Sequence, residues 1–374
     1  MVYNSTRSAI AVTYVGLAGI VPGLALGLVA GVLADRYNRR RTMIVSDVSR
    51  ALIMAFLAGF LYLRGFNLLL ILGVFVIVNS FTAIFFPASS AMLPKLVQKS
   101  ELTQANGFLQ GTTQGAQMIG SAAGGAAIAF VGVVPGLAVN AITYVISAVL
   151  LLQIASTFGR TGGADVKGAA RPPFRTEIVE GLSYMRANLP IMEVTLGFLP
   201  GNLLWVMVTN FTVVYVASYF PGSPAAYGYL VAGLGGGFAL GAFLATRLHL
   251  SRHSGIAMAS MVVMEGAAAL GLSVSHSYAL SLGLSASLGA EAGVINAVYY
   301  STMQAIVPDN VLNRVLSVDQ VGSFAGIPAG LLIGGVLAGK FGIGLDYAVA
   351  GLGLLANGAL MLSLRDLRSL RYTG

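Results

Sequence analysis

Two carboxylates stand inside long apolar stretches of the sequence, where they could carry protons. Glu265 and Glu291 are each flanked by apolar and small residues over a length that would cross a bilayer. An acidic side chain at that depth has to face protein or water rather than lipid, and it favours its protonated form. Both residues are therefore candidates for proton exchange. The alternative for each is a neutral acid that is hydrogen-bonded between two helices.

Amide and aromatic side chains form a second set of polar groups within apolar stretches. Gln110, Gln114 and Gln117 follow helical spacing and form one polar stripe. Further candidates to line a substrate cavity are Asn202, Trp205, Asn210, Asn296 and Tyr299. Such a lining suits an amphipathic small molecule. Ordinary helix packing is the alternative interpretation of these residues.

The densest charge cluster runs from Asp35 to Arg41, in a chain where only 9% of residues are charged. Because it lies between two apolar stretches, it predicts a short loop at a membrane face, and its arginines place that face in the cytoplasm. The arginines could serve only to set this topology. Topology does not require Asp35, so the acid calls for another role.

The composition excludes most other classes of protein. Hydrophobic residues make up 56% of the 374 positions and the mean hydropathy is +0.83, so too few polar side chains exist to cover a soluble domain. The net charge of +8 is spread thinly over loops, which argues against a nucleic-acid partner. Cysteine is absent and the three histidines lack ligand spacing, so we expect no metal site and no cofactor.

Eleven apolar stretches are long enough to cross a bilayer as helices. They cover about Ala9–Leu33, Met43–Leu63, Leu68–Phe86, Phe108–Val131, Val134–Ile154, Ile191–Tyr219, Ala225–Ala245, Gly255–Val274, Tyr278–Ile306, Val315–Leu337 and Ile343–Leu364. With loops alternating between two faces, only Arg7, Arg64 and Lys340 fall opposite the other basic loop residues. Since positive residues concentrate in cytoplasmic loops, we expect a cytoplasmic C-terminus.

The longest polar segment divides these helices into two groups. Within it, Pro172 and Pro173 would stop a helix, and Phe174–Asn188 has the pattern of an amphipathic helix along the cytoplasmic surface. We therefore expect an N-terminal bundle of five helices over residues 1–157, a linker over 158–189 and a C-terminal bundle of six helices over 190–374.

Two glycine patterns recur in the same order in both halves of the chain. Gly23–Gly27 returns as Gly237–Gly241, an offset of 241 − 27 = 214. Gly120–Gly125 returns as Gly330–Gly335, an offset of 330 − 120 = 210. Near-equal offsets indicate a parallel duplication, as in many transporters.

The same offset places the partner of the helix at Ile191 before Met1. We therefore expect the first bundle to lack its opening helix. Either the start codon was assigned downstream, which we favour, or a shortened protein exists.

Several of these segments resemble one transporter superfamily. Gly31–Arg41 resembles the loop between helices 2 and 3 of the major facilitator superfamily, with Asn38 where that pattern has a glycine. Other segments that carry the resemblance are Asp47–Arg50, Pro87–Pro94, Leu102–Asn106 and Val307–Asp309. From about Ser5 to Leu370 the chain is similar to the branch that contains macrolide efflux proteins and the enterobactin exporter.

The resemblance implies an all-α membrane protein whose two bundles rock about a central site and expose it to each face in turn. The expected gating residues are Asp35, Arg36, Arg39, Arg40, Asp47 and Arg50. Asp35 would bind the positive N-terminus of the helix near Arg314. In this family the helix of Glu291 lines the cavity and that of Glu265 lies peripherally, which favours Glu291 for proton coupling.

A glycine pattern is also similar to a motif of exporters in this family. Gly120–Gly125 matches it, with Ser121 at the position of the motif's proline. The small-residue surface permits close contact with another helix. The expected helix-packing residues are Gly115, Gly120, Gly124 and Gly125.

These observations predict a secondary transporter rather than an enzyme. The favoured function is export of amphipathic, drug-like small molecules in exchange for protons, by a monomer in the cell membrane. A siderophore or metabolite transporter of the same fold is the first alternative. A membrane sensor that transports nothing is the second.

Overall fold

A computed structural model describes residues 1–36, 38–98, 131–155, 174–221, 224–247 and 253–370, with isolated helical residues between 109 and 124. Within these ranges the regular structure is helical and contains no strand. The chain divides into two compact units, one of Met1–Arg7, Ala11–Gln117 and Ala127–Ala170, the other of Ser8–Ile10, Met118–Ala126 and Arg171–Gly374.

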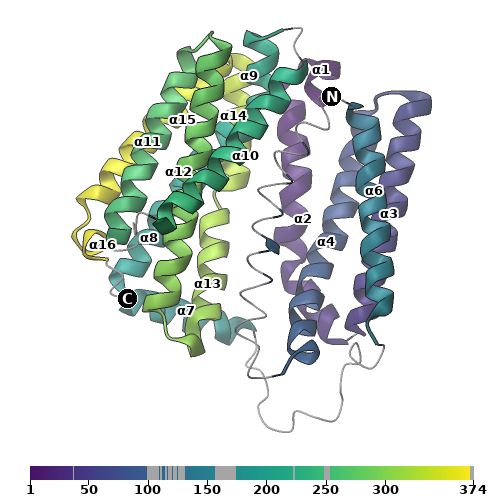
Figure 1. Cartoon of the computed structure of the whole chain (residues 1–374), viewed down its shortest axis with the longest axis horizontal. Coiled ribbons are helices and arrows are strands. Elements are labelled where there is room, and N and C mark those ends of the chain that lie inside the picture. The colour runs from purple at the N-terminus through teal and green to yellow at the C-terminus, as the bar shows by residue number, and fades with distance from the viewer. Residues whose placement is uncertain are drawn as a thin grey trace. The chain divides into compact units, whose positions relative to one another are not determined.

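The first unit contains α1 (Val2–Thr6), α2 (Ala9–Arg36), α3 (Arg39–Arg64), α4 (Leu68–Leu96) and α6 (Val133–Gln153). α3 packs along both α4 and α6 (Figure 1). Asn38 and Asn67 accept hydrogen bonds from the main-chain N–H groups of Arg41 and Leu70, so each caps the start of a helix. Asparagine therefore fixes the start of both α3 and α4.

The second unit contains α7 (Phe174–Ala187), α8 (Leu189–Asn210), α9 (Thr212–Tyr219), α10 (Pro224–Arg247), α11 (Ser254–Val274), α12 (Tyr278–Ile306), α13 (Asp309–Phe324), α14 (Ile327–Lys340), α15 (Ile343–Ser363) and α16 (Arg365–Ser369). α10 packs along α12, and α11 packs along α15 (Figure 1). Met258, Val298 and Leu354 belong to the buried core between these helices.

Glycines set the close approach of α10 and α12. A Cβ atom on Gly237 would meet the main chain of Ala286, and one on Gly241 would meet that of Ala290. The contact is reciprocal, since Cβ atoms on Gly289 and Gly293 of α12 would meet the carbonyl oxygens of Leu234 and Phe238. Small residues that let two backbones touch are a standard means of helix association in membranes.

Helix bounds repeat between the two units, as expected for a parallel duplication. α4 and α12 both have 29 residues and start 278 − 68 = 210 positions apart. α6 and α15 both have 21 residues and start 343 − 133 = 210 positions apart. Each of this second pair follows a glycine with positive φ, Gly132 at 86° and Gly342 at 90°.

The predicted number of eleven membrane helices is not confirmed. Ten helices or helix pairs within the described residues are long and apolar enough to span a membrane. The stretch predicted at 108–131 lies almost wholly outside these residues.

Two predicted spans are interrupted in the structure. The span expected over Ile191–Tyr219 breaks at Phe211, between α8 and α9. The span expected over Val315–Leu337 breaks between α13 and α14, where Pro328 stands in the first turn of α14. Proline has no N–H group to bond the carbonyl four residues earlier, so it interrupts a continuous helix but is accepted in the first turn of a new one. This explains the second break.

Candidate functional site

Glu291 lies on α12 in the interior of the second unit, with 3% of its surface exposed. The hydroxyl of Ser287, one turn earlier, donates to Oε1 at 2.7 Å. Oε2 is buried and has no hydrogen-bond partner in the described part of the chain. The described residues therefore supply one hydrogen-bond donor and no cation to this buried carboxyl group.

Glu265 lies on α11, which packs against α12, and is 6% exposed. Within the described residues, neither a hydrogen bond nor an ion pair joins it to another side chain. Its carboxyl group is close enough to that of Glu291 for the two to interact electrostatically. The sequence presents these acids as alternatives, and the structure places them on two helices that pack together. Two neighbouring buried carboxyl groups disfavour ionisation of both at once.

A third buried acid, Asp319 on α13, was missed by the sequence analysis. Its two carboxylate oxygens accept hydrogen bonds from Thr195 and from Tyr299, one of the predicted cavity residues. The signal was present, because Asp319 lies inside the predicted span Val315–Leu337 and meets the same criterion that selected Glu291.

The other predicted cavity residues of this unit are half-buried and less closely connected. Asn202 and Trp205 lie on α8, and within the described residues no side-chain hydrogen bond or ring contact joins them to α12. Asn210 ends α8, and its amide nitrogen is buried without a partner among the described residues. Asn296 donates to the carbonyl oxygen of Ala292 on its own helix. Of the predicted cavity residues in the described part of this unit, Tyr299 therefore bonds to the buried acid Asp319, and these four residues do not.

The charged segment predicted as a gate is only partly described. Asp35 and Arg36 end α2, and their side chains lie outside the described part of the structure. Arg39 begins α3. Arg40 donates to the carbonyl oxygens of Leu151 at 2.9 Å and Leu152 at 2.7 Å. It thereby satisfies two carbonyls at the C-terminal end of α6, where a cation is favourable.

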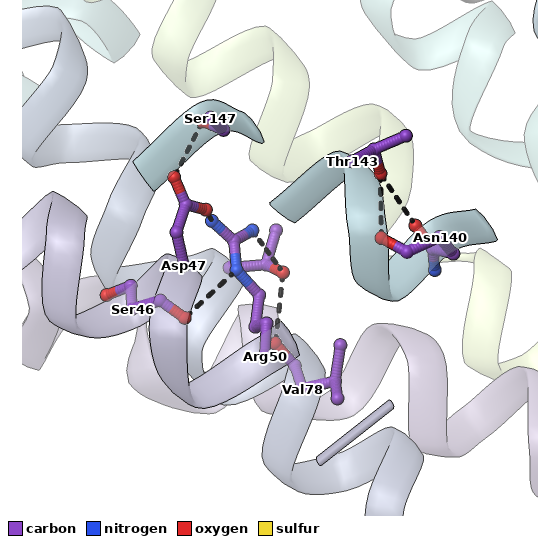
Figure 2. Close-up of polar contacts among 8 residues, drawn as sticks. Ser46, Asp47, Arg50, Val78, Asn140, Thr143 and Ser147 are labelled. Carbon is purple, nitrogen blue, oxygen red and sulfur yellow. Dashed lines mark hydrogen bonds and ion pairs between the residues drawn. The ribbon is translucent and has the colours of Figure 1, made fainter. Parts of the chain in front are cut away.

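Asp47 and Arg50 form a buried ion pair in the first unit (Figure 2). Asp47 also accepts a hydrogen bond of 2.6 Å from Ser147 of α6. Arg50 donates to Thr82 of α4 at 3.3 Å. The pair therefore ties α3 to both of its neighbours.

Two aromatic rings complete the surroundings of Arg50. Its guanidinium carbon lies 4.6 Å from the ring centroid of Phe85 and 4.5 Å from that of Tyr144. Rings at this distance stabilise a cation that has lost its water. This gives a structural reason for the burial of an arginine, while its predicted gating role stays a prediction.

Several predicted residues lie outside the described part of the chain: Gln110, Gln114, Gln117, Gly115 and Gly125. Gly120 and Gly124 are helical, and no described residue lies within 4 Å of the position a Cβ atom would take on either. Close packing of the predicted kind is instead seen at their counterparts in the repeat. A Cβ atom on Gly330 would meet Leu203, and one on Gly334 would meet Phe211.

Comparison with known proteins agrees with this architecture. Residues 1–371 match a protein family described as transmembrane secretion effector. The multidrug efflux pump Tap of Mycolicibacterium fortuitum is 26% identical over 99% of this chain and 91% of its own length. Macrolide efflux protein A of Streptococcus pyogenes is 21% identical over 98% of this chain and 90% of its own.

A solved structure shares the fold. It is an inward-facing, unoccupied bacterial homologue of the human lysosomal transporter Spinster, with a TM-score of 0.63 and 15% identity over 95% of this chain and 88% of that one. The structure of two parallel-repeat helical bundles is thus that of a transporter and not of an enzyme. The chain belongs to the transmembrane secretion effector family of the major facilitator superfamily.

Proposed function

We propose that this protein exports amphipathic, drug-like small molecules in exchange for protons. The observation that carries the proposal is the match over nearly the whole chain to relatives named as multidrug and macrolide efflux proteins. Those names describe the relatives. The substrate class of this protein is part of the proposal.

The mechanism we propose is alternating access by two bundles, residues 1–157 and 190–374, joined by a linker over 158–189. The protein would lie in the cell membrane as a monomer with a cytoplasmic C-terminus. α7 belongs to this linker and packs on α13, where Gly181 lies against the carbonyl of Arg314. The linker would therefore move with the second bundle.

Glu291 is the residue that we propose for proton coupling, with Glu265 as its neighbour. Both are buried, and neither forms an ion pair in the described part of the chain. A carboxyl group without a cation partner changes its charge when it gains or loses a proton, which a coupled exchanger requires. The pair would hold one proton between them while substrate is absent.

The gating role proposed for Asp35 is that of a latch between bundles. Asp35→Asn should then reduce transport while leaving insertion and abundance unchanged. Unchanged transport by this variant would contradict the latch.

The test of function is accumulation of a radiolabelled macrolide in inside-out membrane vesicles with an acidic lumen. We expect accumulation that collapses when nigericin removes the pH gradient. Glu291→Gln should abolish gradient-driven accumulation and retain exchange of labelled for unlabelled macrolide. Asp366→Asn changes an acid outside the predicted spans and serves as the matched control.

The possible outcomes separate the parts of the proposal. If neither the macrolide nor a cationic dye accumulates under any gradient, export of drug-like molecules is wrong, and transport of other cargo or a sensor function gains support. If Glu291→Gln accumulates macrolide like the unmodified protein, export stands and coupling lies elsewhere. A C-terminal tag that is cleaved by protease only in inside-out vesicles would support the proposed orientation.

A further inference from the structure

Asp319 lies where three helices of the second unit meet. Its carboxylate is on α13 and is 6% exposed. Thr195 of α8 donates its hydroxyl hydrogen to Oδ1 at 2.5 Å, and Tyr299 of α12 donates to Oδ2 at 2.5 Å. Each oxygen thus accepts from a different helix, and the carboxylate joins α13 to both.

No cation balances this carboxylate within the described part of the chain. The nearest basic residue along α13 is Arg314, and it forms an ion pair with Glu180 of α7. On α8, the carboxylate of Glu193 accepts from the main-chain N–H of Leu367 at 2.8 Å. α12 contributes two phenols, Tyr299 and Tyr300.

These surroundings act on Asp319 in opposite directions. Two hydroxyl donors favour the charged form, because an ionised carboxylate only accepts hydrogen bonds. Burial without a cation disfavours the charged form, because the carboxylate has lost its water. Neither form is stabilised from all sides, which is the situation expected of a group that gains and loses a proton in use.

Protonation would change the contacts between the helices. A protonated carboxyl group becomes a donor and can no longer accept equally at both oxygens. One of the two hydroxyls, that of Thr195 or that of Tyr299, would then lose its acceptor. The tie of α13 to α8 or to α12 would weaken, so a single proton would alter how these helices are held together.

The ring contacts around Tyr299 indicate that the phenol is held in place. Its ring packs edge-on against the rings of Phe198 of α8 and Tyr300, with 5.4 Å and 5.2 Å between the ring centroids. Because the ring is fixed, the phenol hydroxyl has few other positions to adopt when Asp319 changes its charge. Protonation of Asp319 would therefore change the contact between the helices, because Tyr299 cannot compensate by reorienting its side chain.

We infer that Asp319, held by Thr195 and Tyr299, is a second proton-binding site of this transporter, distinct from Glu291 and Glu265. The inference rests on the proposed exchange of substrate for protons. It adds a role for α13, in which proton uptake at Asp319 loosens α13 from its neighbours during the transport cycle.

The first experiment asks whether Asp319 takes up a proton, without any substrate. Infrared difference spectra of the purified protein in detergent, recorded from mildly acidic to mildly alkaline pH, report the C=O band of protonated carboxyl groups. We expect one component of this band to be absent in Asp319→Asn and present in Glu291→Gln. An identical band in Asp319→Asn and in the unmodified protein would overturn the inference.

Two further variants test the positioning role of the hydroxyls and do not remove the acid. Thr195→Val and Tyr299→Phe each remove one donor to the carboxylate, so the midpoint of the Asp319 band should move about one unit toward higher pH. Thr302→Val and Tyr215→Phe remove buried hydroxyls that bond to Ser254 and Ser281 instead, and they serve as controls. Equal midpoints in all four variants would contradict the inference even if Asp319→Asn failed to fold.

Proton release on substrate binding links the site to transport. In weakly buffered detergent solution, the macrolide should displace about one proton fewer from Asp319→Asn than from the unmodified protein, since an amide does not titrate. Equal release from both proteins would show that Asp319 plays no part in coupling. If the unmodified protein binds the macrolide without releasing protons, the proposed exchange fails, whereas the infrared band still decides whether Asp319 binds a proton.

Discussion

Gly241 of α10 faces the main-chain carbonyl oxygen of Ala290 in α12, with no room for a side chain between the two helices. The same relation holds one turn away between Gly237 and Ala286. Because backbone rather than a flexible side chain occupies the space, the helices would have to separate to accept even a methyl group. The contact therefore holds α10 against α12, the helix that carries Glu291.

We predict that Gly241→Ala destabilises the protein by about 1–3 kcal/mol through overpacking. The matched control is Gly236→Ala on the same helix, where no atom of the described residues lies within 4 Å of the new Cβ atom. Alanine favours a helix over glycine by roughly 0.5–1 kcal/mol, so the control should be neutral or slightly stabilising. Thermal unfolding in detergent gives both values, and equal midpoints would contradict the close contact.

Breaking the buried pair of Asp47 and Arg50 should cost far more than breaking an exposed one. Arg50→Met leaves the Asp47 carboxylate buried, with the Ser147 hydroxyl as its remaining partner in the described part of the chain, for an expected loss of about 3–5 kcal/mol. Arg314→Met breaks the pair with Glu180, whose side chains are 32% and 43% exposed, and should cost less than about 1 kcal/mol.

A double variant separates the loss of a pair from the loss of packing. Asp47→Asn combined with Arg50→Met leaves no unpaired charge, so it should recover part of the stability that Arg50→Met loses. The measurement is again the unfolding midpoint. A double variant no more stable than Arg50→Met alone would mean that the rings of Phe85 and Tyr144, rather than Asp47, account for the effect.

A comparison of Arg40 with Arg41 tests whether the arginines of this segment stabilise the fold or only set the topology. Both carry one positive charge in the first turn of α3, but within the described residues only Arg40 bonds carbonyls at the end of α6, and Arg41 is exposed. We predict that Arg40→Gln lowers stability by roughly 1–2 kcal/mol and that Arg41→Gln leaves it nearly unchanged. Both variants should insert equally well. Equal stability would favour the view that these arginines only set topology.

Most of the membrane helices were predictable from the sequence, because local signals determine them. Apolar stretches of sufficient length predicted the spans, and Asn38, Asn67, Gly132 and Gly342 mark four helix starts in the structure. The duplication was visible because two glycine patterns kept their spacing. These features depend on residues that are close together in the chain.

The polar networks could not be predicted, because their partners come from distant helices. Ser147 lies 100 positions from Asp47, and Thr195 lies 124 positions from Asp319. Spacing shows which face of a helix is polar but not which neighbour that face meets. The acids at 265 and 291 were therefore recognised individually, while their proximity and the partners of Asp319 required the packed structure.

Asp346 is a fully buried acid in the first turn of α15, and neither of its oxygens has a partner in the described part of the chain. An unpaired buried carboxylate is costly, so we predict that Asp346→Asn raises the unfolding midpoint at alkaline pH, where the acid would otherwise have to ionise. The matched control is Asp366→Asn, an acid in the first turn of α16 that is not buried.

Both changes remove a favourable interaction with a helix N-terminus, worth about 0.3–1 kcal/mol. The control should therefore be slightly destabilising, and only at position 346 should relief of the buried charge outweigh that loss. Destabilisation by Asp346→Asn beyond that of the control would mean that this carboxylate is paired in the membrane, with a bound cation or with a residue outside the described part.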